Sequence, residues 1–171
     1  LVSYFVKKKD KVFETYRKKR NILNKSNLFH LNYDFKQNFF LNDSFDLLVH
    51  CAALTPYKYK ISNKIMKLNV EGFKKILKSK SSFKKIVLLS TISVYGNIDK
   101  QTINEKTKKK SVNAYGKSKL QMENILIKYC KKNNVDYLIL RLPGVVGNFQ
   151  GDVNFINLVI KNFTHNKIVK Y

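Results

Sequence analysis

The alternation of short apolar runs with longer segments of helical periodicity constrains the fold of this chain most. Apolar runs cover residues 45–51, 86–89 and 135–141, as expected for parallel strands buried on both faces. The segments 61–79 and 113–133 lie between them and carry apolar residues at the spacing of an amphipathic helix. This order predicts βαβ units with right-handed crossovers and hence an α/β fold, a doubly wound parallel sheet.

The residues before this alternation predict further elements of the same kind. Residues 1–9 resemble the end of an amphipathic helix, 11–16 and 27–32 have strand character, and a short amphipathic piece covers 35–40. A last amphipathic segment at 153–162 has no obvious partner. Ligands of such sheets bind beyond the carboxyl ends of the strands, so we expect the site there.

The chain is strongly basic, and this suggests a nucleic-acid-binding domain as one alternative. It has 34 Lys plus Arg and a formal net charge of +23. The lysines are scattered, however, and only three arginines occur, Arg17, Arg20 and Arg141. A solvated surface that attracts phosphorylated ligands is the favoured interpretation, with no specific nucleic-acid partner.

The two cysteines, Cys51 and Cys130, are far apart and form no Cys-x-x-Cys spacing. We expect reduced thiols rather than disulfides, and no metal site. No apolar run approaches membrane-spanning length, and residues 1–6 are too short for a signal peptide. These features favour a cytoplasmic protein without a membrane partner.

Tyr115 and Lys119 form a Tyr-x-x-x-Lys pair after the strand that ends in Ser90-Thr91. At spacing i, i+4 both side chains project from one helix face, and a nearby ammonium lowers the pKa of a phenol. The phenol then becomes a usable proton donor and acceptor near neutral pH. Tyr4 and Lys8 have the same spacing, so the motif gains meaning only from its context.

Five motifs in order give that context. They are Asp46-x-x-x-His50-x-Ala52-Ala53, Asn69-x-x-Gly72, Leu89-Ser90-Thr91-Ile92-Ser93-Val94-Tyr95-Gly96, Tyr115-x-x-x-Lys119 and Arg141-Leu142-Pro143-Gly144-x-x-Gly147. With them the chain resembles the extended short-chain dehydrogenase/reductase family, the NAD(P)-dependent sugar-nucleotide epimerases, dehydratases and reductases. The resemblance covers almost the whole chain and implies a Rossmann-like sheet.

The resemblance implies a catalytic set of Thr91, Tyr115 and Lys119. Thr91 would hydrogen-bond the reacting oxygen, Tyr115 would be the acid/base, and Lys119 would tune Tyr115 and bind the nicotinamide ribose. The nearest competitor to Thr91 is Ser90, which we interpret as a satisfied turn hydroxyl. His50 is expected to be packed rather than chemically active. Asn69 is either near the active site or a buried brace.

The family's Gly-x-x-Gly-x-x-Gly loop and the first strand before it are absent from this sequence. In the strand order 3-2-1-4-5-6 that first strand is central. We therefore expect a gap in the sheet, low stability of this stretch alone and weak cofactor binding. Residues 1–150 would form a truncated NAD(P)-binding domain, and 151–171 would begin the substrate-binding region.

The cofactor is expected to be NADP or NAD. No carboxylate follows the strand at 11–16, and Arg17 could bind a 2′-phosphate, which favours NADP. Asp34 and Phe35 match the family's adenine-contacting pair. The strand-end residues Cys51, Ala52, Ala53 and Pro143 complete the expected cofactor contacts.

Ile92 and Ser93 replace the Asp-Glu pair that follows the catalytic threonine in dehydratases of this family, which favours an epimerase or reductase. The expected substrate is a nucleotide sugar. A nonenzymatic NAD(P)-binding sensor and an inactive fragment remain alternatives. The family often dimerises through the helices that correspond to 61–79 and 113–133, so the resemblance makes a homodimer one possible state of the whole protein, and the sequence leaves the oligomeric state open.

Overall fold

The computed structural model describes residues 1–16, 25–39, 41–55, 63–97 and 102–145. Its elements in chain order are α1 (Val2–Lys7), β1 (Val12–Tyr16), β2 (Leu28–Asn32), β3 (Ser44–His50), α2 (Asn63–Leu77), β4 (Ser82–Thr91), the short 3-10 helix η1 (Ile92–Val94), α3 (Ala114–Asn133) and β5 (Asp136–Leu142). The predicted alternation of strands and helices is confirmed. Arg17 and the segment 153–162 lie outside the described residues.

The strands form two separate parallel sheets, one of β1 and β2 and one in the order β3-β4-β5. Among the described strands, β1 and β3 share no ladder, although the rings of Phe13 and Phe45 approach to 5.3 Å. A strand running parallel to both would be needed to join the sheets. The expected interruption at the centre of the sheet is therefore confirmed.

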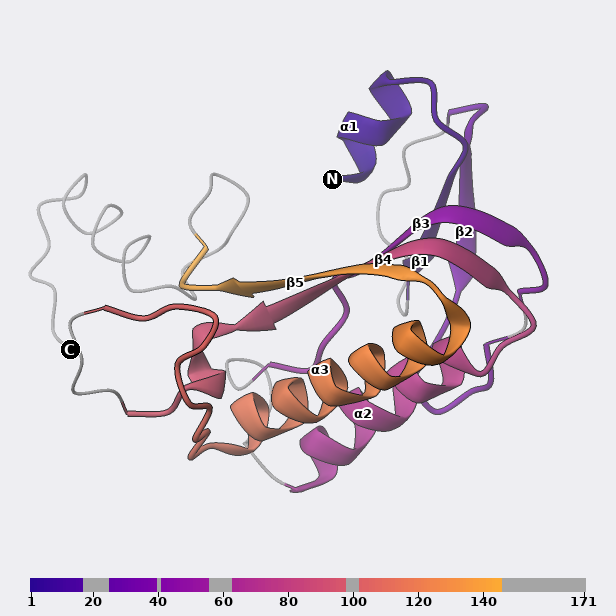
Figure 1. Cartoon of the computed structure of the whole chain (residues 1–171). Coiled ribbons are helices and arrows are strands. Elements are labelled where there is room, and N and C mark those ends of the chain that lie inside the picture. The colour runs from indigo at the N-terminus through magenta and orange to yellow at the C-terminus, as the bar shows by residue number, and fades with distance from the viewer. Residues whose placement is uncertain (17–24, 40, 56–62, 98–101, 146–171) are drawn as a thin grey trace, which may run out of the picture.

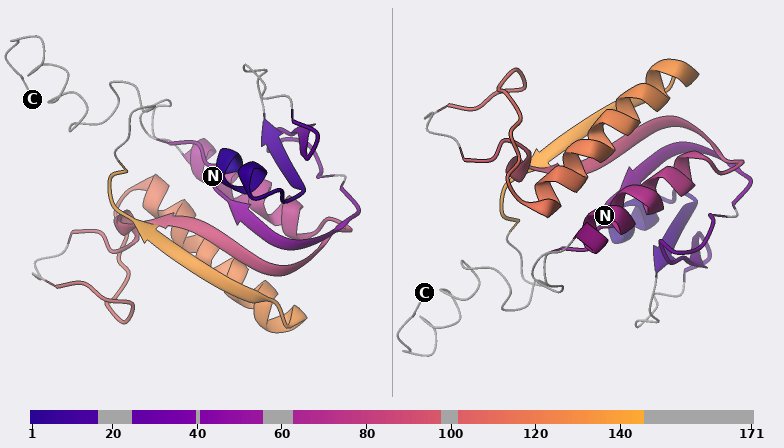
Figure 2. Two further views of the ribbon diagram at one scale, coloured as in Figure 1. Left: turned by 90° about the horizontal axis from the view of Figure 1, so that it is seen from above. Right: turned by 90° about the horizontal axis from the view of Figure 1, so that it is seen from below.

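Helices α2 and α3 lie side by side against one face of the β3-β4-β5 sheet (Figure 1). Viewed from above, the three strands lie in front of these helices (Figure 2). Leu47, Leu138 and Leu140 lie on the opposite face and remain 38%, 45% and 37% exposed. The packed core of the described residues is therefore on the helix side of this sheet.

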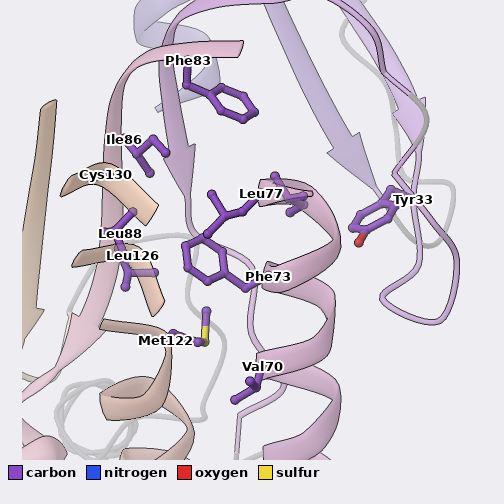
Figure 3. Close-up of a cluster of buried hydrophobic side chains, with 11 residues drawn as sticks. Tyr33, Val70, Phe73, Leu77, Phe83, Ile86, Leu88, Met122, Leu126 and Cys130 are labelled. Atoms are coloured by element: carbon purple, nitrogen blue, oxygen red, sulfur yellow. The ribbon is translucent and has the colours of Figure 1, made fainter. Parts of the chain in front are cut away.

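That core is centred on Phe73, which projects from α2 toward Leu88 of β4 and Leu126 of α3 (Figure 3). Phe73, Ile86, Leu88, Met122 and Leu126 are each 0% exposed. In β4, Ile86 and Leu88 have this orientation because alternate residues of a strand point to the same face. Burying each such side chain contributes roughly 1.5–3 kcal/mol, so these contacts hold β4 and the two helices together.

Helix α3 is bounded by an asparagine at each end. The side chain of Asn113 accepts a hydrogen bond of 2.7 Å from the backbone N–H of Gly116, which satisfies one of the free donors of the first turn. Asn134 ends the helix in the left-handed conformation at φ 53°. The helix thus starts at a fixed position, beside the carboxyl end of β4, with Tyr115 in its first turn.

The amphipathic piece expected at 35–40 is a turn in its described part. Asp34 accepts hydrogen bonds from the backbone N–H groups of Lys36 and Gln37, at 3.0 and 2.9 Å. Such local capping competes with helix formation. The rings of Phe35 and Phe39 pack edge-on against Tyr33, at 6.1 and 5.1 Å.

Within the described ranges, no helix is long and apolar enough to cross a membrane.

Candidate active site

A cavity of about 170 Å³ opens at the carboxyl ends of β4 and β5. It is lined by Cys51, Leu89, Ser90, Thr91, Tyr115, Lys119, Leu142, Pro143 and Val145. Five of the residues expected in the site from the sequence therefore lie together: Cys51, Thr91, Tyr115, Lys119 and Pro143. The cavity combines a hydroxyl, a phenol and an amine with apolar walls, which is the usual composition of a small-molecule site.

Thr91 is the last residue of β4 and also the N-cap of η1. Its Oγ1 accepts a hydrogen bond of 3.2 Å from the backbone N–H of Ser93 and donates to Ser93 Oγ at 3.2 Å. These two bonds fix the hydroxyl at the strand tip. Only 9% of Thr91 is exposed, so the rotamer is also held by packing.

Tyr115 and Lys119 meet as the helical spacing predicted, with Lys119 Nζ 6.0 Å from the centre of the Tyr115 ring. Lys119 is only 2% exposed, and its Nζ donates a hydrogen bond of 2.7 Å to the Leu89 carbonyl oxygen. Burial lowers the pKa of Lys119 to about 8, while Cys51 and Glu123 act in the opposite direction. The amine is therefore mostly protonated at neutral pH and close to titrating just above it.

The pair Tyr4 and Lys8 provides an internal comparison. Lys8 Nζ also lies 6.0 Å from the centre of the Tyr4 ring. Tyr4 is 60% exposed, however, and the pair lies at α1 and does not line the cavity. The spacing alone therefore gives the same geometry at both places, and only burial and the cavity distinguish Tyr115 and Lys119.

The structure gives Asn69 the geometry of a brace. It is 0% exposed, and it accepts from the Leu54 N–H at 2.7 Å and donates to the Leu54 carbonyl at 3.1 Å and to Ser118 Oγ at 3.3 Å. Asn69 thus connects the loop after β3 to α3. Its contact on α3, Ser118, lies on the same helix turn as Lys119.

His50 is packed against the core, as predicted from the sequence. Its ring lies 4.7 Å from that of Phe73, and only 3% of the residue is exposed. Burial lowers the pKa of His50 to about 3, and the charge of Lys119 lowers it further. A neutral imidazole that packs on the core fits a structural role.

The remaining expected cofactor contacts do not line this cavity. Ala52 and Ala53 follow Cys51 in the loop after β3, and Asp34 and Phe35 lie in the turn after β2. The Phe35 side chain fills the space beside Gly72 of α2. The roles of these residues as cofactor contacts stay predictions, and Arg17 lies outside the described residues.

A buried polar cluster that was not predicted from the sequence lies behind the cavity. Ser90 Oγ donates to Glu123 Oε1 at 2.6 Å, so its hydroxyl is satisfied by a carboxylate rather than within a turn. Arg141 forms a bidentate pair with Glu123, at 3.0 and 3.0 Å. The position of Glu123 four residues after Lys119 was the available signal, because that spacing continues the same helix face.

Replacing Gly116 by alanine is expected to destabilise the site. A Cβ at this position would lie 2.5 Å from the Ser93 carbonyl oxygen and would also contact Ser111 Oγ. Because the backbone after Thr91 would have to shift, we expect a loss of about 1–3 kcal/mol in the free energy of unfolding, measured by urea denaturation of the native protein. Gly144→Ala is the matched control, since no described residue other than its chain neighbours has an atom within 4 Å of the added Cβ. Equal losses for both variants would contradict the packing argument.

Comparison with known proteins identifies a family and several relatives of this chain. A family model described as the NAD dependent epimerase/dehydratase family matches residues 1–171. The UDP-glucose 4-epimerase of Streptococcus mutans is 34% identical over 110 residues, covering 62% of this chain and 33% of that protein. UDP-arabinose 4-epimerase 1 of Arabidopsis thaliana is 28% identical over 120 residues, covering 64% of this chain and 27% of that protein.

A similar fold occurs in a crystal structure of the dTDP-glucose 4,6-dehydratase of Bacillus anthracis in complex with NAD. The TM-score is 0.73 at 18% sequence identity, and the match covers 97% of this chain and 57% of the other. The Rossmann-like architecture predicted from the sequence is therefore confirmed. The chain spans about a third or less of the two curated relatives' length and little more than half of the solved chain.

Proposed function

The chain belongs to the NAD-dependent epimerase/dehydratase family, and from this premise we propose that it supplies the proton-transfer part of an NAD(P)-dependent site for a nucleotide sugar. The observation that carries the proposal is the convergence of Thr91, Tyr115 and Lys119 on one cavity at the end of β4. A phenol beside a buried amine is suited to general acid–base work, and the threonine hydroxyl can hold the reacting oxygen.

The lining of the cavity fits the nicotinamide end of the cofactor. Lys119 offers a buried donor, and Leu142, Pro143 and Val145 give an apolar wall for a flat ring. When bound, the cofactor supplies a hydride acceptor or donor. The glycine-rich loop for its pyrophosphate does not occur in this sequence, so these residues account only for the nicotinamide part.

In the proposed reaction Tyr115 Oη exchanges a proton with a hydroxyl or carbonyl oxygen of the sugar. The ammonium of Lys119 stabilises the phenolate that forms when Tyr115 acts as a base. Thr91 Oγ1, which donates its one proton to Ser93 Oγ here, would turn that proton toward the same substrate oxygen and hold the oxygen near the phenol. An epimerase or reductase is favoured over a dehydratase, because Ile92 and Ser93 supply no acid–base pair after Thr91.

Turnover of the native protein is expected to fall as the pH rises through about 8. Burial lowers the pKa of Lys119 to about 8, so its charge is present below that pH and lost above it. Loss of the ammonium removes the stabilisation of the Tyr115 phenolate, so kcat should decrease on the alkaline side. The pH profile of kcat tests this. A profile that stays level into the ordinary titration range of lysine amines would contradict it.

The substrate class is tested by incubating the native protein with NAD or NADP and a panel of UDP-sugars and dTDP-sugars. Proton NMR of the sugar then detects epimerised, reduced or dehydrated product. We expect conversion by the wild type and its loss in Thr91→Val. If the wild type binds cofactor but converts none of the sugars, the nonenzymatic sensor becomes the better interpretation.

A further inference from the structure

Glu123 is a buried carboxylate that the proposed reaction does not use. It is 1% exposed, lies on α3 one turn after Lys119, and does not line the cavity. Burying a charge is costly unless it is paired and hydrogen-bonded. The carboxylate of Glu123 therefore needs ionic and hydrogen-bonding partners. The positions of these partners show which elements Glu123 connects.

The carboxylate joins three elements. Arg141 of β5 donates to both of its oxygens at 3.0 Å, and Ser90 of β4 donates to Oε1 at 2.6 Å. Arg141 also donates through Nη1 to Tyr95 Oη at 2.9 Å, and Tyr95 donates to the Asn104 carbonyl at 3.2 Å. The cluster therefore extends from α3 through both strands into the loop that leads to Tyr115.

Two neighbouring residues of β4 are each bound to α3. Leu89 accepts from Lys119 at 2.7 Å, and Ser90 donates to Glu123 at 2.6 Å, one helix turn further on. Thr91 follows these residues in β4, and Tyr115 precedes Lys119 by one turn of α3. The two bonds thus fix how the strand tip stands relative to the helix face that carries the phenol.

From this geometry we propose that Glu123 is a positioning residue that fixes α3 to the end of β4 and so sets the spacing between Thr91 and Tyr115. The inference rests on the proposed function, because it assigns Glu123 a part in aligning that acid–base pair. Arg141 and Ser90 act through Glu123 in the same way. Glu123 and Arg141 do not line the cavity, and Ser90 lines it but donates its hydroxyl proton to Glu123.

The charge of Glu123 also acts on Lys119. Burial is the largest influence on the pKa of Lys119, and Cys51 and Glu123 oppose it. Burial raises the pKa of the Cys51 thiol and lowers that of His50 to about 3. Replacing Glu123 by glutamine would remove one of these opposing influences on Lys119 and would leave the guanidinium of Arg141, which pairs with both Glu123 oxygens at 3.0 Å, uncompensated.

The test compares Glu123→Gln with Glu71→Gln, which removes an exposed carboxylate paired with Lys74 on α2. Two readouts are measured in the native protein: kcat and KM for the nucleotide sugar, and the titration of Lys119 by NMR of isotope-labelled lysine, assigned with Lys119→Met.

In Glu123→Gln we expect the midpoint of Lys119 to fall by on the order of one pH unit. We also expect kcat to fall roughly a hundredfold with KM little changed, because alignment is lost. Glu71→Gln should change neither.

The Ser90→Ala variant distinguishes an effect of lost alignment from an effect of lost charge. It also provides the test if Glu123→Gln fails to fold. It removes one hydrogen bond to Glu123 and leaves every charge in place, so kcat should fall while the midpoint of Lys119 stays. A folded Glu123→Gln or Ser90→Ala variant with wild-type kcat would overturn the proposal. The lysine titration needs no turnover, so it remains informative if the proposed function fails.

Discussion

Replacing Tyr115 by phenylalanine is expected to lower kcat of the native protein by about a hundredfold to ten-thousandfold, the usual contribution of a general acid–base group. The substitution removes only the hydroxyl, and the ring stays beside Lys119. Packing and cofactor binding should therefore be preserved, and the measured change should be in kcat. Steady-state kinetics together with a cofactor titration by fluorescence measures both quantities.

Tyr4→Phe is the control for this experiment. It has the same Tyr-x-x-x-Lys spacing and the same 6.0 Å distance from its lysine, but it is exposed and away from the cavity. We expect its kcat to equal that of the wild type. Equal activity of Tyr115→Phe and the wild type would exclude Tyr115 as the acid/base.

The largest effect on stability is expected for Phe73→Ala. Phe73 is 0% exposed and packs between α3, β4 and the ring of His50. Removing a buried phenylalanine ring leaves a cavity and costs about 3–5 kcal/mol. Because domains are stable by only about 5–15 kcal/mol, the variant should be close to unfolding at ambient temperature. Urea denaturation of the native protein measures the difference.

Leu138→Ala is the matched control for the core. Leu138 lies on the opposite face of the sheet and is 45% exposed. Its truncation removes few contacts, so the expected loss is well under that of Phe73→Ala. A comparable loss would indicate that the open face of the sheet is covered in the native protein.

The sequence predicted most of the fold because periodicity is a local property. The apolar run of β4 and the helical stripes of α2 and α3 follow from residues close together in the chain. The interruption between β1 and β3 also followed, since the motif order showed which strand had no counterpart. The conformation of segment 35–40 was harder to predict from the sequence. Its apolar spacing suggested amphipathic structure, but the side-chain cap of Asp34 gives a turn.

The site was predictable where spacing along one helix decides the geometry. Tyr115 and Lys119 share a face of α3, and Thr91 ends the neighbouring strand, so their meeting followed from the topology. The role of Glu123 did not follow, because its partners Ser90 and Arg141 lie 33 and 18 residues away. Periodicity marks such a carboxylate as facing inward but does not say which donors meet it.

A double-mutant cycle on Tyr115→Phe and Lys119→Met tests most directly whether these residues form one proton-transfer unit. Because Lys119 acts through the phenol, Lys119→Met should change kcat little in a protein that already lacks the Tyr115 hydroxyl. The predicted result is that kcat of the double variant is close to that of Tyr115→Phe alone. If instead the two losses in kcat multiply, Tyr115 and Lys119 act independently, and the proposed site is wrong.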